Sequence, residues 1–116
     1  MKNYDTGLPN SDGSPCLVID VFETAIMFPD WGPNGPVGLT ASVLGDRMAL
    51  LYTCTAAPDA EMADDGSYAK LAKDAEIDLP AADWIKLREL YKAARFPTDQ
   101  PTARVVDNVR KALEKK

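Results

Sequence analysis

The sequence predicts a single α+β domain, in which an antiparallel β-sheet is followed by three C-terminal α-helices packed on one face of the sheet. Three observations predict this. Apolar residues alternate on both sides of a glycine turn in residues 37–54, apolar stripes at helical spacing recur after residue 67, and 116 residues suit one domain of ordinary size. We expect a flexible N-terminal arm over residues 1–15 and one domain over residues 16–116.

The first three segments are assigned from their composition. Residues 1–15 are rich in Gly, Pro, Asn, Asp and Ser, which are residues of turns. Residues 16–28 are dense in β-branched and aromatic side chains, which favours a strand. Their apolar positions also fit a helical stripe, so a helix stays open as the alternative. Residues 29–36 contain three prolines and two glycines, so we expect an irregular loop there.

The clearest predicted element is a β-hairpin over residues 37–54. Gly45 and Asp46 suit the two central positions of a type II′ turn. The register that this turn imposes places eight apolar residues on one face of the hairpin, whereas the opposite face is mixed. These eight residues are Val37, Leu39, Ala41, Val43, Met48, Leu50, Tyr52 and Cys54. The predicted sheet is therefore centred on this hairpin.

Three helices are predicted after the hairpin, at residues 68–77, at residues 81–95 and from residue 101 to the end. Ser67 is placed to cap the first helix. Pro97 ends the second, because the residue before a proline disfavours helical backbone angles. Pro101 suits the first turn of the third helix.

Charge is distributed unevenly along the chain. The formal net charge is −5, yet residues 1–66 carry two basic against ten acidic residues and residues 67–116 carry eleven against eight. An acidic chain lacks the clustered Lys and Arg that phosphate contacts need, so nucleic acid is disfavoured as a partner. The charge suits a basic protein surface, although solubility alone is the simpler explanation.

The residue types of common catalytic sites are missing or dispersed. Histidine, the usual general base and the commonest metal ligand, is absent. No motif of a serine hydrolase, a nucleotide-binding loop or a zinc protease occurs. Asp20 and Glu23 are the best carboxylate pair, but residues three apart on a strand point to opposite faces. We therefore expect no enzyme activity and no cofactor.

Neither the two cysteines nor the acidic connector of residues 58–66 predicts a metal site. Cys16 and Cys54 do not complete a zinc site without histidine, and without a CxxC pattern we expect them to be reduced core residues. Aligning the connector to an EF-hand places Ala72 where a bidentate glutamate is required.

No membrane or secretory segment is predicted. The longest apolar runs, residues 25–28 and 48–52, are far shorter than the roughly 20 residues that a membrane span needs. The first residues lack the apolar core of a signal peptide. We expect no membrane partner and a cytoplasmic location.

Three groups of residues are candidates for contact with a partner protein. A tryptophan in a stiff loop is a typical interface anchor, although Trp31 would equally suit a cap over the sheet. The acidic connector offers negative charge, and a stripe of bases at helical spacing offers positive charge. The candidates are Phe28, Asp30 and Trp31 in the loop, Asp59, Glu61, Asp64 and Asp65 in the connector, and Arg88, Lys92 and Arg95 in the stripe.

The function that we expect is non-catalytic protein binding, by a small inhibitor, immunity or accessory protein of the phage or mobile-element type. One alternative is DNA binding, because residues 71–88 loosely resemble a degenerate helix-turn-helix. Glu76 departs from that motif where its turn usually has glycine. The other alternative is a structural homo-oligomer, formed through the mixed face of the predicted hairpin.

Overall fold

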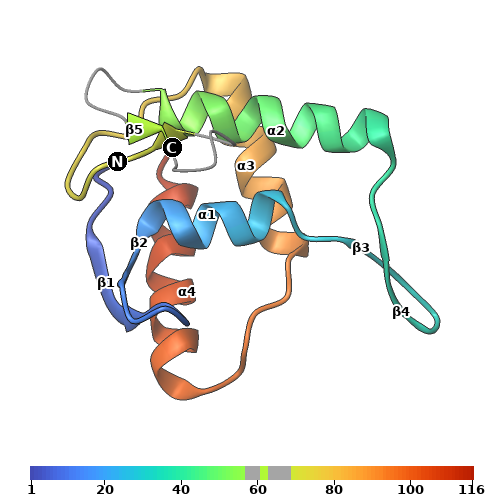
Figure 1. Cartoon of the computed structure of the whole chain (residues 1–116), viewed down its shortest axis with the longest axis horizontal. Helices are drawn as coiled ribbons and strands as arrows, with labels where there is room; N and C mark the ends of the chain where they lie inside the picture. The colour runs from blue at the N-terminus through green and yellow to red at the C-terminus, as the bar shows by residue number, and fades with distance from the viewer. Residues whose placement is uncertain (57–60, 63–68) are drawn as a thin grey trace.

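The computed structural model describes residues 1–56, 61–62 and 69–116 (Figure 1). The helices in this part of the chain are α1 (Val18–Ile26), α2 (Ala41–Thr55), α3 (Ala81–Ala93) and α4 (Gln100–Glu114). Its strands form three antiparallel pairs, which are β1 (Asp5–Pro9) with β2 (Pro15–Leu17), β3 (Asp30–Gly32) with β4 (Gly35–Gly38), and β5 (Glu61–Met62) with β6 (Ala69–Lys70). The α+β class is confirmed at this coarse level.

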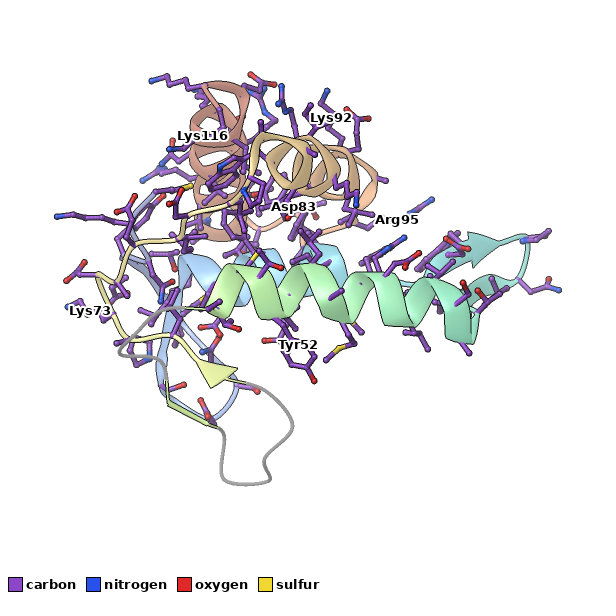
Figure 2. All side chains as sticks on the ribbon, turned by 90° about the horizontal axis from the view of Figure 1, so that it is seen from above. Tyr52, Lys73, Asp83, Lys92, Arg95 and Lys116 are labelled. Carbon is purple, nitrogen blue, oxygen red and sulfur yellow. The ribbon has the colours of Figure 1, made fainter. Side chains whose placement is uncertain are left out.

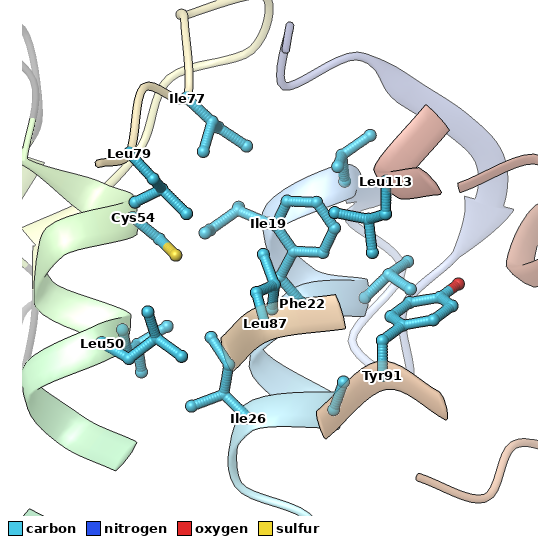
Figure 3. Packing of buried hydrophobic residues seen from close by; sticks show 14 of the residues in the cluster. Ile19, Phe22, Ile26, Leu50, Cys54, Ile77, Leu79, Leu87, Tyr91 and Leu113 are labelled. Carbon is cyan, nitrogen blue, oxygen red and sulfur yellow. The ribbon is translucent and has the colours of Figure 1, made fainter. Parts of the chain in front are cut away.

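The core forms around α1, which packs against α2 and α3, while α3 also packs against α4. Six of the nine residues of α1 are buried, because apolar side chains occupy most of its circumference. Figure 3 shows this packing, with residues drawn from all four helices and from the loop before α3: Ile19, Phe22, Ile26, Leu50, Cys54, Ile77, Leu79, Leu87, Tyr91 and Leu113.

The first residues of the chain, expected as a flexible arm, contain β1 and are hydrogen-bonded to the loop of residues 71–77. Asn3 is fully buried there. Its Nδ2 donates to the carbonyls of Leu71 (3.2 Å) and Ala72 (3.0 Å), and its Oδ1 accepts from the backbone N–H of Ile19 (2.8 Å). One side chain therefore connects the N-terminal segment, the start of α1 and a loop that follows it by about 50 residues.

The predicted hairpin over residues 37–54 is wrong, since most of this segment is helix α2. The helix begins where the Thr40 side chain accepts a hydrogen bond from the backbone N–H of Val43 (3.3 Å). The Ala, Leu, Arg and Met residues that follow are strong helix formers, and together they outweigh the cost of about 1 kcal/mol of an internal Gly45. The predicted sheet with three helices on one face is consequently not the observed arrangement.

Two neighbouring predictions are wrong for related reasons. The strand favoured for residues 16–28 is observed only at its start, and the helical alternative describes the rest. Residues 29–36 are not irregular, because β3 and β4 pair across a two-residue loop formed by Pro33 and Asn34. The apolar positions of residues 16–28 fit a helical stripe, but their β-branched and aromatic composition favours a strand.

The helix predicted over residues 68–77 is also wrong where the structure describes it. Residues 69–70 form β6, and residues 71–80 run as a loop that bonds to the N-terminal segment. Without a first helix, the helix-turn-helix that the DNA-binding alternative requires over residues 71–88 is not formed.

The two C-terminal helices are confirmed, with small shifts at their ends. The Asp99 carboxylate accepts the backbone N–H (3.1 Å) and the hydroxyl (2.8 Å) of Thr102, which caps α4. Tyr91 of α3 donates its hydroxyl to the carbonyl of Val106 in α4 (2.7 Å). Within the described residues, no helix is long and apolar enough to cross a membrane.

Candidate protein-binding surface

The β3–β4 hairpin projects away from the helices, beyond the end of α1 and below the start of α2 (Figure 1). Its loop is short because Gly32 pairs directly with Gly35, which has a φ of +112° that side-chain-bearing residues rarely adopt. Val37 packs so close to Gly32 that a Cβ there would lie 2.8 Å from Val37 Cγ1. The two glycines therefore permit a tight and narrow hairpin.

Trp31 is half exposed, with 51% of its surface accessible, although it is the largest side chain of the hairpin. Its ring stacks on that of Phe28, with centroids 6.1 Å apart and an interplanar angle of 12°. The Arg95 guanidinium lies over the Trp31 ring, 4.5 Å from the centroid. Figure 2 shows Arg95 at the end of α3 nearest the hairpin. The indole is thus fixed in place without being buried.

A recess of about 210 Å³ lies beside this indole, where the ends of α1 and α3 meet β3 and α2. Arg47 of α2 lines it and donates from Nη1 to the carbonyl of Ile26 at the end of α1 (2.9 Å). This bond satisfies one of the carbonyls that the end of α1 leaves free. We define the Trp31 patch by the charged and aromatic residues of this recess: Phe28, Asp30, Trp31, Arg47 and Arg95.

The positive charge of the Trp31 patch is not neutralised by ion pairs within the described residues. The observed ion pairs join the N-terminal amine to Glu76, and lysines or Arg110 to carboxylates on their own helices. Neither Arg47 nor Arg95 takes part in them, and Asp30 forms none with either arginine. The patch therefore combines an exposed indole with two guanidinium groups that no carboxylate among the described residues neutralises.

Four of the ten predicted contact residues come together in this patch. The sequence predicts Phe28, Asp30 and Trp31 as neighbours in one loop and places Arg95 in a separate basic stripe, whereas the structure joins all four at one recess. The other two bases of that stripe lie elsewhere on α3. Lys92 is exposed and pairs with Glu89 (3.7 Å), and Arg88 has a buried Nε without a hydrogen-bond partner among the described residues.

The described part of the acidic connector does not contribute to the Trp31 patch. Glu61 lies in β5, where its backbone pairs with Lys70. Asp59, Asp64 and Asp65 lie outside the described residues.

Arg47 is the one member of the patch that is not among the residues predicted from the sequence. The buried residues of α2 include Leu50, Leu51 and Cys54. They follow Arg47 by three, four and seven residues, which is helical spacing, so Arg47 lies on the same side of the helix. A single arginine on an otherwise apolar helix face is the signal that would have found it.

The two cysteine thiols show no activation. Burial raises the pKa of the Cys54 thiol to about 12, and it also raises the pKa of the half-buried Cys16 thiol. Both thiols therefore stay protonated near neutral pH. In the described ranges, no three Cys, Asp or Glu residues are grouped closely enough to hold a metal ion.

The acidic pair on α1 is arranged differently from the prediction. Because the segment is a helix, Asp20 and Glu23 share one side and line the same groove of about 710 Å³. Burial, together with the Asp20 charge, raises the pKa of Glu23. The Asp20 carboxylate accepts hydrogen bonds from the N–H of Leu17 (2.9 Å) and from Asn10 Nδ2 (3.3 Å), so Asp20 contributes to the start of α1.

Compared with models of protein families, with curated proteins and with solved structures, the chain shows no significant match. Its function is therefore argued from its own surface.

Proposed function

We propose that this chain is a non-catalytic protein-binding module and that the Trp31 patch, with the β3–β4 hairpin, is its contact surface. The observation that carries the proposal is the fixed but half-exposed indole of Trp31, stacked on Phe28 and covered by Arg95. Tryptophan and arginine are the side chains most enriched among residues that dominate binding energies.

Fixing the indole in advance favours binding. A side chain already held in one position loses little conformational entropy when a partner covers it, which leaves more of the contact energy as affinity. The projection of the hairpin supports the same role, because Val37 exposes 68% of its surface and a partner can reach both strands. An inhibitor, immunity or accessory protein acts through a surface of this kind.

Affinity capture with matched variants tests the proposal. Wild type, Trp31→Ala and Ile85→Ala serve as baits in lysate of the native source, and retained proteins are quantified by mass spectrometry. Ile85 is the control, because it is equally exposed (55%) but lies on α3, in the groove facing α2. Circular dichroism of each bait confirms that it is folded.

We expect one partner to be retained by wild type and by Ile85→Ala and to be lost with Trp31→Ala. Removal of a central tryptophan typically costs about 2 kcal/mol or more of binding free energy, which is about thirtyfold in affinity. Equal retention by the Trp31→Ala bait would contradict the proposal. Loss with Ile85→Ala alone would assign the contact surface to the groove between α2 and α3 instead.

A further inference from the structure

We infer that the Trp31 patch receives a single carboxylate group of the partner protein, held by the guanidinium groups of Arg47 and Arg95. The inference rests on the proposed function, since it names the chemical group that the partner supplies. Two arginines from separate helical regions line one recess of about 210 Å³, in which Asp30 is the one acidic residue among those described.

Arg47 and Arg95 have more hydrogen-bond donors than their contacts within the described residues use. A guanidinium group carries five N–H donors and no acceptor. Arg47 donates one hydrogen bond, from Nη1 to the carbonyl of Ile26. The Arg95 guanidinium group lies over the Trp31 ring, and this contact leaves most of its N–H groups available as donors. The chain has 18 acidic against 13 basic residues, yet no described carboxylate forms an ion pair with either arginine.

The recess suits a single carboxylate better than a chain of phosphates. The planar guanidinium fork matches a carboxylate with two parallel hydrogen bonds. A nucleic acid would also find an aromatic ring and arginines attractive, but it brings a chain of phosphates. The net charge of −5 and the carboxylate of Asp30 at the recess repel a polyanion far more than a single negative group.

The apolar lining of the recess limits which chemical group can carry the carboxylate. Phe28 and Trp31 line the recess together with the apolar side chains of Ala25 and Leu90. A carboxylate attached to a short apolar or aromatic group therefore fits better than a fully hydrated one. Phenylacetate has this chemistry, and phenylacetamide has the same shape without the charge.

The test is an NMR titration of the folded chain with each of these two probes. The chain has two tryptophans, so the indole N–H of Trp31 reports on the recess and that of the buried Trp84 is an internal reference. We expect phenylacetate to shift the Trp31 signal and not the Trp84 signal. Phenylacetamide should bind at least about tenfold more weakly, because it lacks the charge-assisted hydrogen bonds.

Variants connect the binding to the arginines. Arg95→Gln should weaken phenylacetate binding about tenfold and weaken phenylacetamide binding much less, because only the charged probe loses a charge-assisted hydrogen bond. Lys92→Gln removes the same charge from the last turn of α3, three residues before Arg95 but outside the recess, so its dissociation constant should stay within about twofold of wild type. Arg95→Gln is preferred to an Arg47 variant, because Arg47 also holds the end of α1.

Equal affinity for the two probes, or no shift of the Trp31 signal, would overturn the inference. Binding of a thymidine oligonucleotide that displaces phenylacetate and is lost with Arg95→Gln would assign the patch to single-stranded nucleic acid, and it would overturn the inference as well. Affinity capture with Trp31→Ala does not depend on these probes, so the carboxylate site and the protein-binding function fail independently.

Discussion

The molecule contains two regions that are stabilised in different ways. In the body, α1 is surrounded by α2, α3 and α4, and its apolar side chains are buried. In the projecting arm, which consists of β3, β4 and residues 41–49 of α2, most side chains are exposed. The body therefore depends on apolar burial, whereas the arm depends on glycines, a short turn and helix propensity.

This difference separates the residues that maintain the fold from those that serve the proposed function. A side chain of the arm can be exchanged at small cost in stability, and this freedom allows a surface to change its partner while the fold persists. A side chain of the body cannot be exchanged without a larger loss of stability. Substitutions in the two regions should therefore differ in their effect on the free energy of unfolding.

The largest effect is expected in the body. Phe22 is fully buried in the centre of α1, so Phe22→Ala should lower the free energy of unfolding by about 3–5 kcal/mol, through lost burial and the cavity that remains. Urea denaturation followed by circular dichroism measures this change. Ile85→Ala, at an exposed position, should stay within about 0.5 kcal/mol of wild type. Similar values for the two variants would contradict the conclusion that the body is stabilised by apolar burial.

The second prediction concerns the buried polar contact of the body. Asn3→Ala should lower the free energy of unfolding by about 2–3 kcal/mol, because it leaves the N–H of Ile19 and the carbonyls of Leu71 and Ala72 without their partner. Asn108→Ala, at an exposed position of α4, is the control and should change little. A small effect of Asn3→Ala would show that water replaces these bonds.

The third prediction compares two glycines of the arm. Gly35→Ala should destabilise the hairpin by about 1 kcal/mol, because its φ of +112° strains any residue with a Cβ. Gly45→Ala should stabilise the chain by about 1 kcal/mol, because it lies inside α2 with open space around it. Hydrogen exchange of the hairpin amides measures the effect of Gly35→Ala, and urea denaturation measures the effect of Gly45→Ala. Destabilisation by Gly45→Ala would instead support a turn at that position.

The smallest effect is a pH dependence at the start of α4. Hydrogen bonds from the hydroxyl and the backbone N–H of Thr102 lower the pKa of Asp99 in the folded state. The stability that Asp99 contributes is therefore present above the ordinary aspartate pKa and is lost as the pH falls through the lowered one. Unfolding should be measured against pH for wild type and Asp99→Asn, which keeps a capping side chain but does not titrate. This assignment would be contradicted if the free energy of unfolding of Asp99→Asn fell with decreasing pH as steeply as that of wild type.

The sequence is most informative where structure is determined locally. Helices α3 and α4 are predictable, because prolines lie near their ends and their apolar stripes are regular. Helix α1 begins at Val18, after the N-cap residue Leu17, which has no side-chain acceptor, and the missing acceptor is supplied by Asn3 from another segment. Such a contact between distant segments leaves no local pattern to detect.

The candidate site, too, is predictable only where its residues are neighbours in the sequence. Trp31 and its neighbours in the loop are recognisable because an aromatic residue among prolines and glycines is unusual. That Arg95 lies over this indole depends on how α1 packs against α3, and neither segment encodes that packing by itself. Arg47 was missed because its helix was interpreted as a hairpin.

The hydrogen bonds of Asn3 also constrain the order in which the chain can fold during synthesis. Its Nδ2 partners, Leu71 and Ala72, are translated 68 and 69 residues later. Until they have left the ribosome, Asn3 lacks the carbonyls that fix it in place, and α1 lacks its buried cap. The nascent chain is therefore expected to remain loosely structured until well past its midpoint and to complete its core late, as α3 and α4 emerge.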